Sequence, residues 1–275
     1  MKQRFLFALI ALIGLVALSS HNLFIKFKSF YLKPGTETLV YLYNGTFSES
    51  HSVLARNRMI DVSLLNPGEQ IMHPDTSAWY EENSQTILNI KTGKAGTAIL
   101  GTSTLPRINE YTPKIFVENM KHEGLLDVLV ARKKSGEDSN PVKKKYSKHV
   151  KAIFQIGDKR SDDYKTVFGY PIELIPINNP YSLKIGDELS MKLLINGKPK
   201  EDIMVYASYN DQHGYTKDGT PIDAFKVRTN SQGVVKIKIT EAGHWYFRTV
   251  YMMKNPEKDA DYLSNSATLT FEIRK

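Results

Sequence analysis

The chain has 275 residues, 37 Lys and Arg against 29 Asp and Glu, a formal charge of +8 and no cysteine. A chain without cysteine has neither disulfides nor a lipidated cysteine anchor, so its stability must come from packed cores, and its length suffices for two ordinary domains. The basic excess gathers at residues 132–151, which in an exported chain predicts a solvated face and excludes nucleic acid as the expected partner.

The first twenty residues have the layout of a secretory signal peptide. Lys2 and Arg4 precede an apolar run at residues 5–18, and the small residues Ser19 and Ser20 follow it. The run is short for a membrane span, and no second run of spanning length follows. We therefore expect an exported protein, in the periplasm or at the cell surface, that does not span the membrane after signal cleavage.

The cleavage site decides the position of His21. Cleavage after Ser20 makes His21 the first residue of the mature chain, and cleavage after Ser19 makes it the second. An N-terminal histidine offers its amine and its imidazole, which can close a chelate ring on Ni(II), Co(II) or Cu(II). The alternative is that His21 only precedes a strand at residues 23–32.

Beyond residue 21, most segments alternate apolar and polar residues between turn residues. This period of two is typical of antiparallel strands with one buried face, as at residues 187–198, 233–240 and 267–273. We predict a mainly β protein with two antiparallel β-sandwich domains, immunoglobulin-like or prealbumin-like. The N-terminal sandwich is expected at residues 21–111 and the C-terminal sandwich at residues 168–275.

A weak internal repeat supports two similar sandwiches. YLKPGTE at 31–37 resembles SLKIGDE at 182–188, and each precedes an apolar strand that ends in Asn-Gly, a dipeptide typical of hairpin turns. KAGTAILGT at 94–102 parallels EAGHWYFRT at 241–249 in the same order. In both copies a turn glycine opens one strand and an Ala-Gly corner opens a later one.

The pattern becomes helical at residues 112–167, which we predict to be a helical insert and linker between the sandwiches. Thr112 and Pro113 form a typical helix start, and Gly124 is placed to end that helix. A second apolar stripe follows at residues 125–130. Asn140-Pro141 then predicts a third helix, whose apolar stripe is Tyr146, Val150, Ile153 and Phe154.

No catalytic motif stands out in a supporting context, so we expect a protein that is not an enzyme. The seven histidines form no close pair at metal-ligand spacing, and a metal site must therefore be assembled by the fold. His244 opens the predicted strand 244–253, with Trp245, Phe247 and Tyr251 on its opposite face.

Seven segments of the chain together resemble the domain-of-unknown-function family 4198, a family of exported bacterial proteins of which some accompany nickel or cobalt uptake systems. The resembling segments are HNLFIK at 21–26, YLKPGTETLVYL at 31–42, EGLLDVLVARK at 123–133, KYSKHVKAIFQIG at 145–157, YPIELIPINNPYSLKIGD at 170–187, AGHWYFRTVYM at 242–252 and ADYLSNSATLTFEI at 260–273. The resemblance implies a histidine at the mature N-terminus, which matches His21. Two positions depart from the family pattern: Tyr251 stands where a histidine is expected, and Asn265-Ser266 replaces an aromatic pair.

These observations favour an exported, non-enzymatic binding protein, accessory to uptake of nickel or cobalt, that passes the ion to a membrane metal transporter. The candidate metal residues are His21, His244 and Tyr251, and the candidate ions are Ni(II), Co(II) and Cu(II). The alternative is a periplasmic or surface structural module that binds protein or glycan, which exposed Trp or Tyr clusters would favour. A hydrolase is the third possibility and requires a cleft with a nucleophile and a base.

Overall fold

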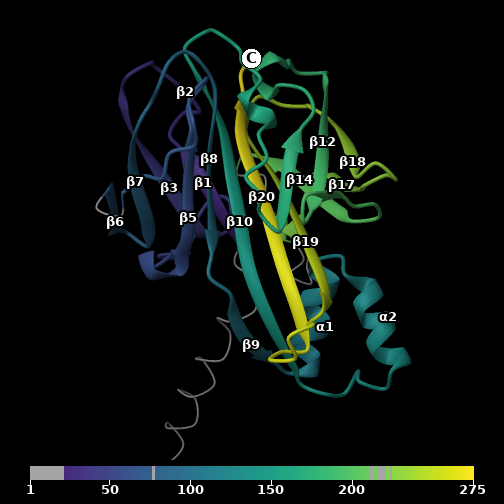
Figure 1. The fold of residues 1–275 in the computed structure, drawn as a ribbon. Coiled ribbons are helices and arrows are strands. Elements are labelled where there is room, and N and C mark those ends of the chain that lie inside the picture. Colours follow the sequence, from purple (N-terminus) through teal and green to yellow (C-terminus); the bar gives the residue numbers. More distant parts are fainter. Residues whose placement is uncertain (1–21, 76–77, 211–213, 216–220, 223–224) are drawn as a thin grey trace, which may run out of the picture.

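A computed structural model describes residues 22–75, 78–210, 214–215, 221–222 and 225–275 (Figure 1). The described chain is mainly β, as predicted. Its strands are β1 (Asn22–Phe27), β2 (Tyr31–Leu32), β3 (Glu37–Gly45), β4 (Ser50–Ser52), β5 (Met59–Leu65), β6 (Trp79–Glu82), β7 (Gln85–Lys91), β8 (Gly96–Thr104), β9 (Arg107–Tyr111), β10 (Val142–Ile156), β11 (Ile172–Pro176), β12 (Glu188–Ile195), β13 (Lys198–Pro199), β14 (Met204–Tyr209), β15 (Gly214–Tyr215), β16 (Pro221–Ile222), β17 (Phe225–Arg228), β18 (Val234–Lys238), β19 (Gly243–Lys254) and β20 (Tyr262–Ile273). The helices are α1 (Pro113–His122) and α2 (Leu126–Lys134), with short 3-10 turns at η1 (Arg56–Arg58), η3 (Asp163–Lys165) and η4 (Pro180–Ser182).

A nine-stranded sheet runs through both halves of the chain. Its main path is β17-β14-β19-β20-β10-β8-β5, and β2 and β9 pair with β10 off that path. β10 and β20 lie side by side at the centre, as Figure 1 shows, and they pair in parallel from Lys144 opposite Tyr262 to Ala152 opposite Thr270. The central strand pair therefore joins the N-terminal and the C-terminal half.

Two smaller sheets cover opposite faces of the nine-stranded sheet. One contains β1, β3, β7, β6 and β4, and the other contains β11, β12, β13 and β18. Thr270 Oγ1 donates to Ile25 O of β1 at 2.6 Å, whereas Lys151, the register partner of Leu269, reaches Glu173 of β11 at 2.9 Å. Because successive residues of a strand point to opposite faces, the two small sheets lie on opposite sides, which gives the antiparallel sandwich packing that the sequence predicts.

The internal repeat corresponds to equivalent structural positions. Gly35 and Gly186 have φ angles of 68° and 101° and precede β3 and β12, one in each small sheet. Gly96 and Gly243 begin β8 and β19, which both belong to the large sheet. The two repeats thus contribute one strand each to a small sheet and to the shared sheet.

The Asn-Gly dipeptides of the two repeats behave differently. Asn196 and Gly197 have φ angles of 48° and 73° and turn the chain between β12 and β13. Asn44 and Gly45 are instead the last two residues of β3, at a register shift against β4. The turn between β3 and β4 follows them, with Thr46 N donating to Glu49 O at 2.9 Å, so the turn lies just after the predicted dipeptide.

The predicted helical insert is confirmed for its first two helices. Thr112 Oγ1 accepts from Ile115 N at 3.4 Å at the start of α1, and Gly124, with φ of 71°, follows its end. The third predicted helix is wrong, because residues 142–156 form β10. Val150, Ile153 and Phe154 are all buried, since both faces of this central strand are covered, and their spacing therefore imitated a helical stripe.

The hydrophobic core follows the same plan. One continuous cluster extends from β1 residues such as Leu23 to β20 residues such as Phe271 and crosses the middle of the large sheet. A smaller cluster packs the two helices against the start of β10, the end of β19 and the start of β20, with Phe116 and Tyr262 at its centre. The domain boundaries near residues 112 and 168 stay a prediction. β10 pairs with strands of both halves, β8 and β20.

Candidate functional site

The start of β1 is the place where the N-terminal residues join the described fold. Asn22 pairs with Gly45 of β3, and Leu23 O accepts from Thr268 Oγ1 at 2.7 Å. Phe24 packs edge-on against Phe47 and Tyr246, with ring centroids 5.3 and 5.2 Å away. The predicted signal peptide and His21 lie outside the described residues. The contacts of Asn22 nevertheless define which side chains surround the point where His21 is attached.

A histidine lies beside this point. A Cβ atom added to Gly45 would be 2.5 Å from Glu49 O, 2.9 Å from His51 N and 3.1 Å from His51 Cγ. The absence of a side chain at Gly45 therefore allows β4 to approach β3 closely and brings the His51 ring next to the partner of Asn22. His51 Nε2 also lies 4.0 Å from Glu49 Oε2. The His51 imidazole and the Glu49 carboxylate therefore lie on one side of the strand position that pairs with Asn22.

The carboxylate of Glu123, after the end of α1, is held by a buried arginine. Its Oε2 accepts from Arg248 at 3.0 Å, and its Oε1 lies 3.6 Å from His122 Nδ1. The Arg248 guanidinium stacks over the Tyr206 ring at 4.1 Å. Both charged side chains are about 5 % exposed, and a buried carboxylate needs such a partner. Arg248 is the register partner of Thr268, and Thr268 donates to Leu23 O. The ion pair of Arg248 and Glu123 therefore lies on the face of β20 that packs against β1.

Lys148 of β10 has an unusual protonation equilibrium. Its Nζ donates to Asn44 Oδ1 at 2.9 Å, and Asn44 is the register partner of Leu23. Burial, followed by the positive charges of Arg58 and Lys144, lowers the pKa of Lys148 to about 7. The ammonium group therefore loses its charge near neutral pH, and its repulsion of a second cation weakens in the same range.

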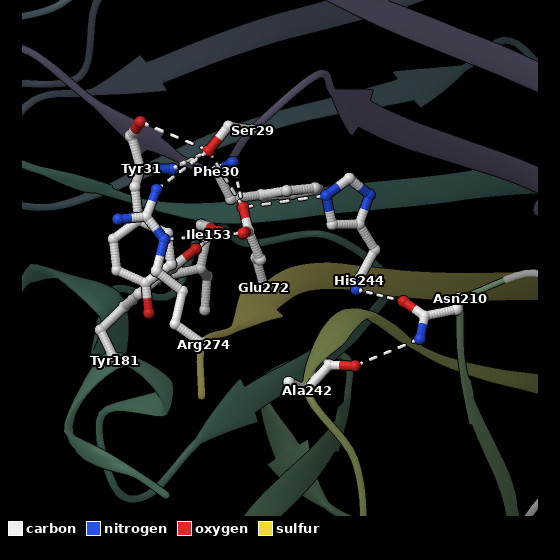
Figure 2. Close-up of polar contacts among 10 residues, drawn as sticks. All are labelled: Ser29, Phe30, Tyr31, Ile153, Tyr181, Asn210, Ala242, His244, Glu272 and Arg274. Carbon is white, nitrogen blue, oxygen red and sulfur yellow. Dashed lines mark hydrogen bonds and ion pairs between the residues drawn. The ribbon is translucent and has the colours of Figure 1, made fainter.

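The predicted site residue His244 lies at the other end of β1. Its Nε2 is 3.7 Å from Glu272 Oε2, and its ring packs edge-on against Phe30 at 5.0 Å. Figure 2 shows this group, with Asn210 Oδ1 accepting from His244 N at 2.9 Å. The Glu272 carboxylate also accepts from Phe30 N at 2.7 Å and from Ser29 Oγ at 3.1 Å. Glu272 thus fixes the turn after β1, and His244 completes this contact.

The predicted site residue Tyr251 belongs to a third location. It is half-buried against the main core, and its register partner on β20 is Asn265. Asn265 Oδ1 lies 3.1 Å from His149 Nε2, and His149 Nδ1 lies 2.9 Å from Ser103 Oγ. Burial lowers the pKa of His149, so the neutral ring donates from Nε2 to Asn265 and accepts the Ser103 hydroxyl proton at Nδ1. Asn265, one of the two departures from the family pattern, is thus a hydrogen-bond partner of a buried histidine.

His244 and Tyr251 do not share a site. They are seven residues apart on β19, which separates them by roughly 23 Å along the strand and places their side chains on opposite faces. In the part of the chain that the structure describes, no group of three or more His, Cys, Asp or Glu residues is arranged to hold a metal ion. A metal site at any of these positions requires a further ligand.

Sequence reasoning did not select His51 or Glu123 as site residues. In the sequence His51 resembles an ordinary loop histidine. Its position depends on the close approach of β4 to Gly45, and the Asn-Gly dipeptide alone does not predict that approach. Glu123 follows α1 directly in a predicted helical insert, and only the tertiary packing of α1 against β19 brings it to Arg248. Neither helix, of 10 and 9 residues, has the length and apolar character to cross a membrane.

Comparisons with known proteins give a family and low structural similarity. No curated protein matches the chain. Among solved structures, Escherichia coli alpha-2-macroglobulin activated by porcine elastase is similar at 9% identity and a TM-score of 0.25, over 91% of this chain and 20% of that chain. The D0-D1 domain of Intimin is similar at 11% identity and a TM-score of 0.22, over 90% of this chain and 96% of that chain. The Escherichia coli adhesin FdeC is similar at 14% identity and a TM-score of 0.24, over 85% of this chain and 60% of that chain.

The chain therefore spans about a fifth of the length of the alpha-2-macroglobulin, and similarity at this level assigns no function to it. The family model described as Domain of unknown function (DUF4198) matches residues 18–253, which include every strand of the small sheets and most of the shared sheet. Since this match covers most of the sequence, the chain belongs to the DUF4198 family.

Proposed function

We propose that the protein is an exported, non-enzymatic binding protein that holds a nickel or cobalt ion as its cargo at the start of β1 and delivers it to a membrane metal transporter. The observation that carries the proposal is the position of His51 beside Gly45, the register partner of Asn22. His21, directly bonded to Asn22, would supply its imidazole and, after cleavage at Ser20, its amine. Imidazole and amine nitrogens suit Ni(II), Co(II) and Cu(II) better than Mg(II) or Ca(II).

The charges around the start of β1 limit the proposed site. Lys148 donates to Asn44 in this region, and its pKa of about 7 means that much of its charge is lost at neutral pH. The carboxylate of Glu49, 4.0 Å from the His51 ring, would offset part of the metal charge. The proposed ligands are His21 and His51, and His244 and Tyr251 lie outside the proposed site.

The test is calorimetric titration of the exported and naturally processed protein with Ni(II), Co(II) and Cu(II), after mass spectrometry has established the N-terminus. We expect one ion per chain, loss of binding in His21→Ala and at least about tenfold weaker binding in His51→Ala. His73→Ala is the matched control, because His73 is an exposed histidine on another loop. Absence of binding by the correctly processed chain, or equal affinity of His51→Ala and native protein, would contradict the proposal.

A second candidate is the structural or interaction module. Ile60 on β5, the last strand on the main path of the large sheet, is 55 % exposed, and the neighbouring Leu105 is 44 % exposed. Exposed apolar side chains at a strand edge favour contact with another protein. Trp79 and Trp245 are buried, which argues against a tryptophan platform for glycan stacking. This candidate becomes the leading one if the metal titration is negative.

A further inference from the structure

An open pocket of about 820 Å³ lies where the two halves of the molecule meet, away from the start of β1. It is formed by β2, the chain after β10, the η4 turn with the residues that follow it, and the end of β20. None of the histidines that the structure describes lines it. It therefore differs in place and in chemistry from the proposed metal site.

The side chains that line this pocket are strongly cationic. Its basic residues are Arg160, Lys184, Arg274 and Lys275, and its acidic residue is Asp158. Among the described residues that line the pocket, four basic side chains face one carboxylate. A concave surface with this balance attracts anions, and guanidinium groups recognise carboxylates through paired hydrogen bonds.

The two arginines are held in place by aromatic and backbone contacts. The Arg274 guanidinium lies 3.6 Å from the centre of the Tyr31 ring, and its Nη2 donates to Ser29 Oγ at 3.4 Å. Figure 2 shows Tyr31, Tyr181 and Arg274 together, with Arg274 against Tyr31. Its Nε is 3.7 Å from Glu272 Oε1, an ion pair that offsets part of its charge, and the Arg274 side chain is still 56 % exposed and lines the pocket.

Arg160 is oriented independently of Arg274. Its Nε donates to Tyr181 O at 2.9 Å and its Nη1 to Asp158 O at 3.0 Å, so neutral carbonyls position the group without cancelling its charge. Tyr181 is itself fixed, because its hydroxyl donates to Ile153 O at 2.6 Å. Cationic groups that are already oriented lose less conformational entropy when a ligand binds.

The remaining walls determine what kind of anion fits. Leu183, half-buried, and Ile185, 47 % exposed, line the pocket with the two tyrosines. An inorganic ion would leave these apolar surfaces in water, whereas an organic anion covers them. We propose that this pocket binds a small organic polycarboxylate, with carboxylates on Arg160 and Arg274 and its carbon skeleton against Tyr31 and Ile185.

The test uses the metal-free full chain, prepared with a chelating resin because EDTA is itself a polycarboxylate. Calorimetric titrations with citrate and with benzene-1,3,5-tricarboxylate are compared with inorganic phosphate at the same ionic strength. We expect at least one tricarboxylate to bind with a Kd of about 1 mM or lower, and phosphate to bind at least about tenfold more weakly. Arg160→Gln and Arg274→Gln should each weaken tricarboxylate binding about tenfold or more.

Lys198→Gln is the matched control, since Lys198 is an exposed lysine on β13, outside the pocket. Thermal unfolding of each variant checks its fold, and Arg160→Gln carries the test if Arg274→Gln is destabilised. No tricarboxylate binding at about 10 mM, equal binding of phosphate, or unchanged affinity in the folded arginine variants would overturn the proposal. Metal binding is measured separately, so failure of one proposal leaves the other standing.

Discussion

Lys148 links the stability of the fold to pH at the level of a single residue. Its pKa falls from the ordinary value of 10.5 to about 7 because burial and the charges of Arg58 and Lys144 disfavour the ammonium form. Between these two values the unfolded chain binds a proton that the folded chain does not. The free energy of unfolding therefore rises with pH across this range, and the cost of the buried charge is largest below pH 7.

Replacing Lys148 with methionine removes this cost. We expect Lys148→Met to be more stable than the native protein by roughly 1–2 kcal/mol at pH 6, because a desolvated charge on a half-buried side chain gives way to an apolar group of similar size. The advantage should shrink as the pH rises above 7 and disappear above about pH 10.5, where Lys148 is neutral in the folded and the unfolded chain and keeps its hydrogen bond to Asn44. Urea unfolding at several pH values measures the difference, with Lys198→Met as an exposed control. A difference independent of pH would contradict the shifted pKa.

The buried pair of Lys151 and Glu173 gives a second prediction for single residues. Glu173 accepts from Lys151 and also from the backbone N–H groups of Phe168, Gly169 and Tyr170, at distances of 2.7 to 3.0 Å. Glu173→Leu leaves a buried ammonium and three N–H groups without an acceptor, so we expect it to cost about 3–5 kcal/mol.

Lys151→Met leaves the carboxylate with its three N–H donors, and we expect a smaller cost of about 1–3 kcal/mol. The double variant should be less destabilised than the sum of the two, which urea unfolding can measure as a double-mutant cycle. A larger loss in Lys151→Met than in Glu173→Leu would show that the N–H groups matter less than the ion pair.

The contact between β3 and β4 can be tested at the level of these elements. In Gly45→Ala the new Cβ atom meets Glu49 O at 2.5 Å and His51 N at 2.9 Å, so β4 has to move away. We expect a loss of about 1–3 kcal/mol by urea unfolding. Gly35→Ala is the comparison, because its Cβ meets no atom within 4 Å and only the φ angle of 68° is unfavourable. If Gly45→Ala costs no more than Gly35→Ala, the close approach does not constrain β4.

The elements also show how far the sequence determines the fold. Alternating residues predicted β12 and β18, which each have one buried face. They also predicted β20, which is covered on both faces but carries the polar residues Thr268 and Thr270 on the face toward β1. The same argument failed for β10, which is covered on both faces, so its buried residues follow no period of two. Thr112-Pro113 and Gly124 predicted α1 because capping depends on local geometry.

The candidate site was predictable only where it depends on chain position. His21 was selected for its place at a cleavage site, and His244 was correctly placed at the start of a strand. The placement of His244 and Tyr251 on opposite faces was predicted too, because it follows from alternation along the single strand β19. The position of His51 near the start of β1 was not predicted, because it depends on the pairing of Asn22 with Gly45 and on the register shift between β3 and β4. Register between strands distant in sequence cannot be read from a single sequence.

On the scale of the whole molecule, the shared sheet predicts that both halves unfold together. β10 pairs with β8 and with β20, and one hydrophobic cluster crosses both halves. Trp79 and Trp245 are buried in different halves, so Trp79→Phe and Trp245→Phe each leave one fluorescent reporter. In each variant the urea midpoint from tryptophan fluorescence should equal the midpoint from circular dichroism, so that the two reporters agree once the effect of each substitution on stability is taken into account. Separate midpoints for the two reporters would instead support two independent domains.

The parallel pairing of β10 with β20 also sets the order in which the strands of the molecule can pair during folding. Lys143 and Asp261, hydrogen-bonded at the ends of these strands, are separated by 118 residues, so the contact order at the centre of the sheet is high. Such long-range pairing closes slowly and after the local hairpins. Until the last strand has paired, β10 has an open edge. A truncated product that ends before Tyr262 would keep this edge open and would be prone to aggregation.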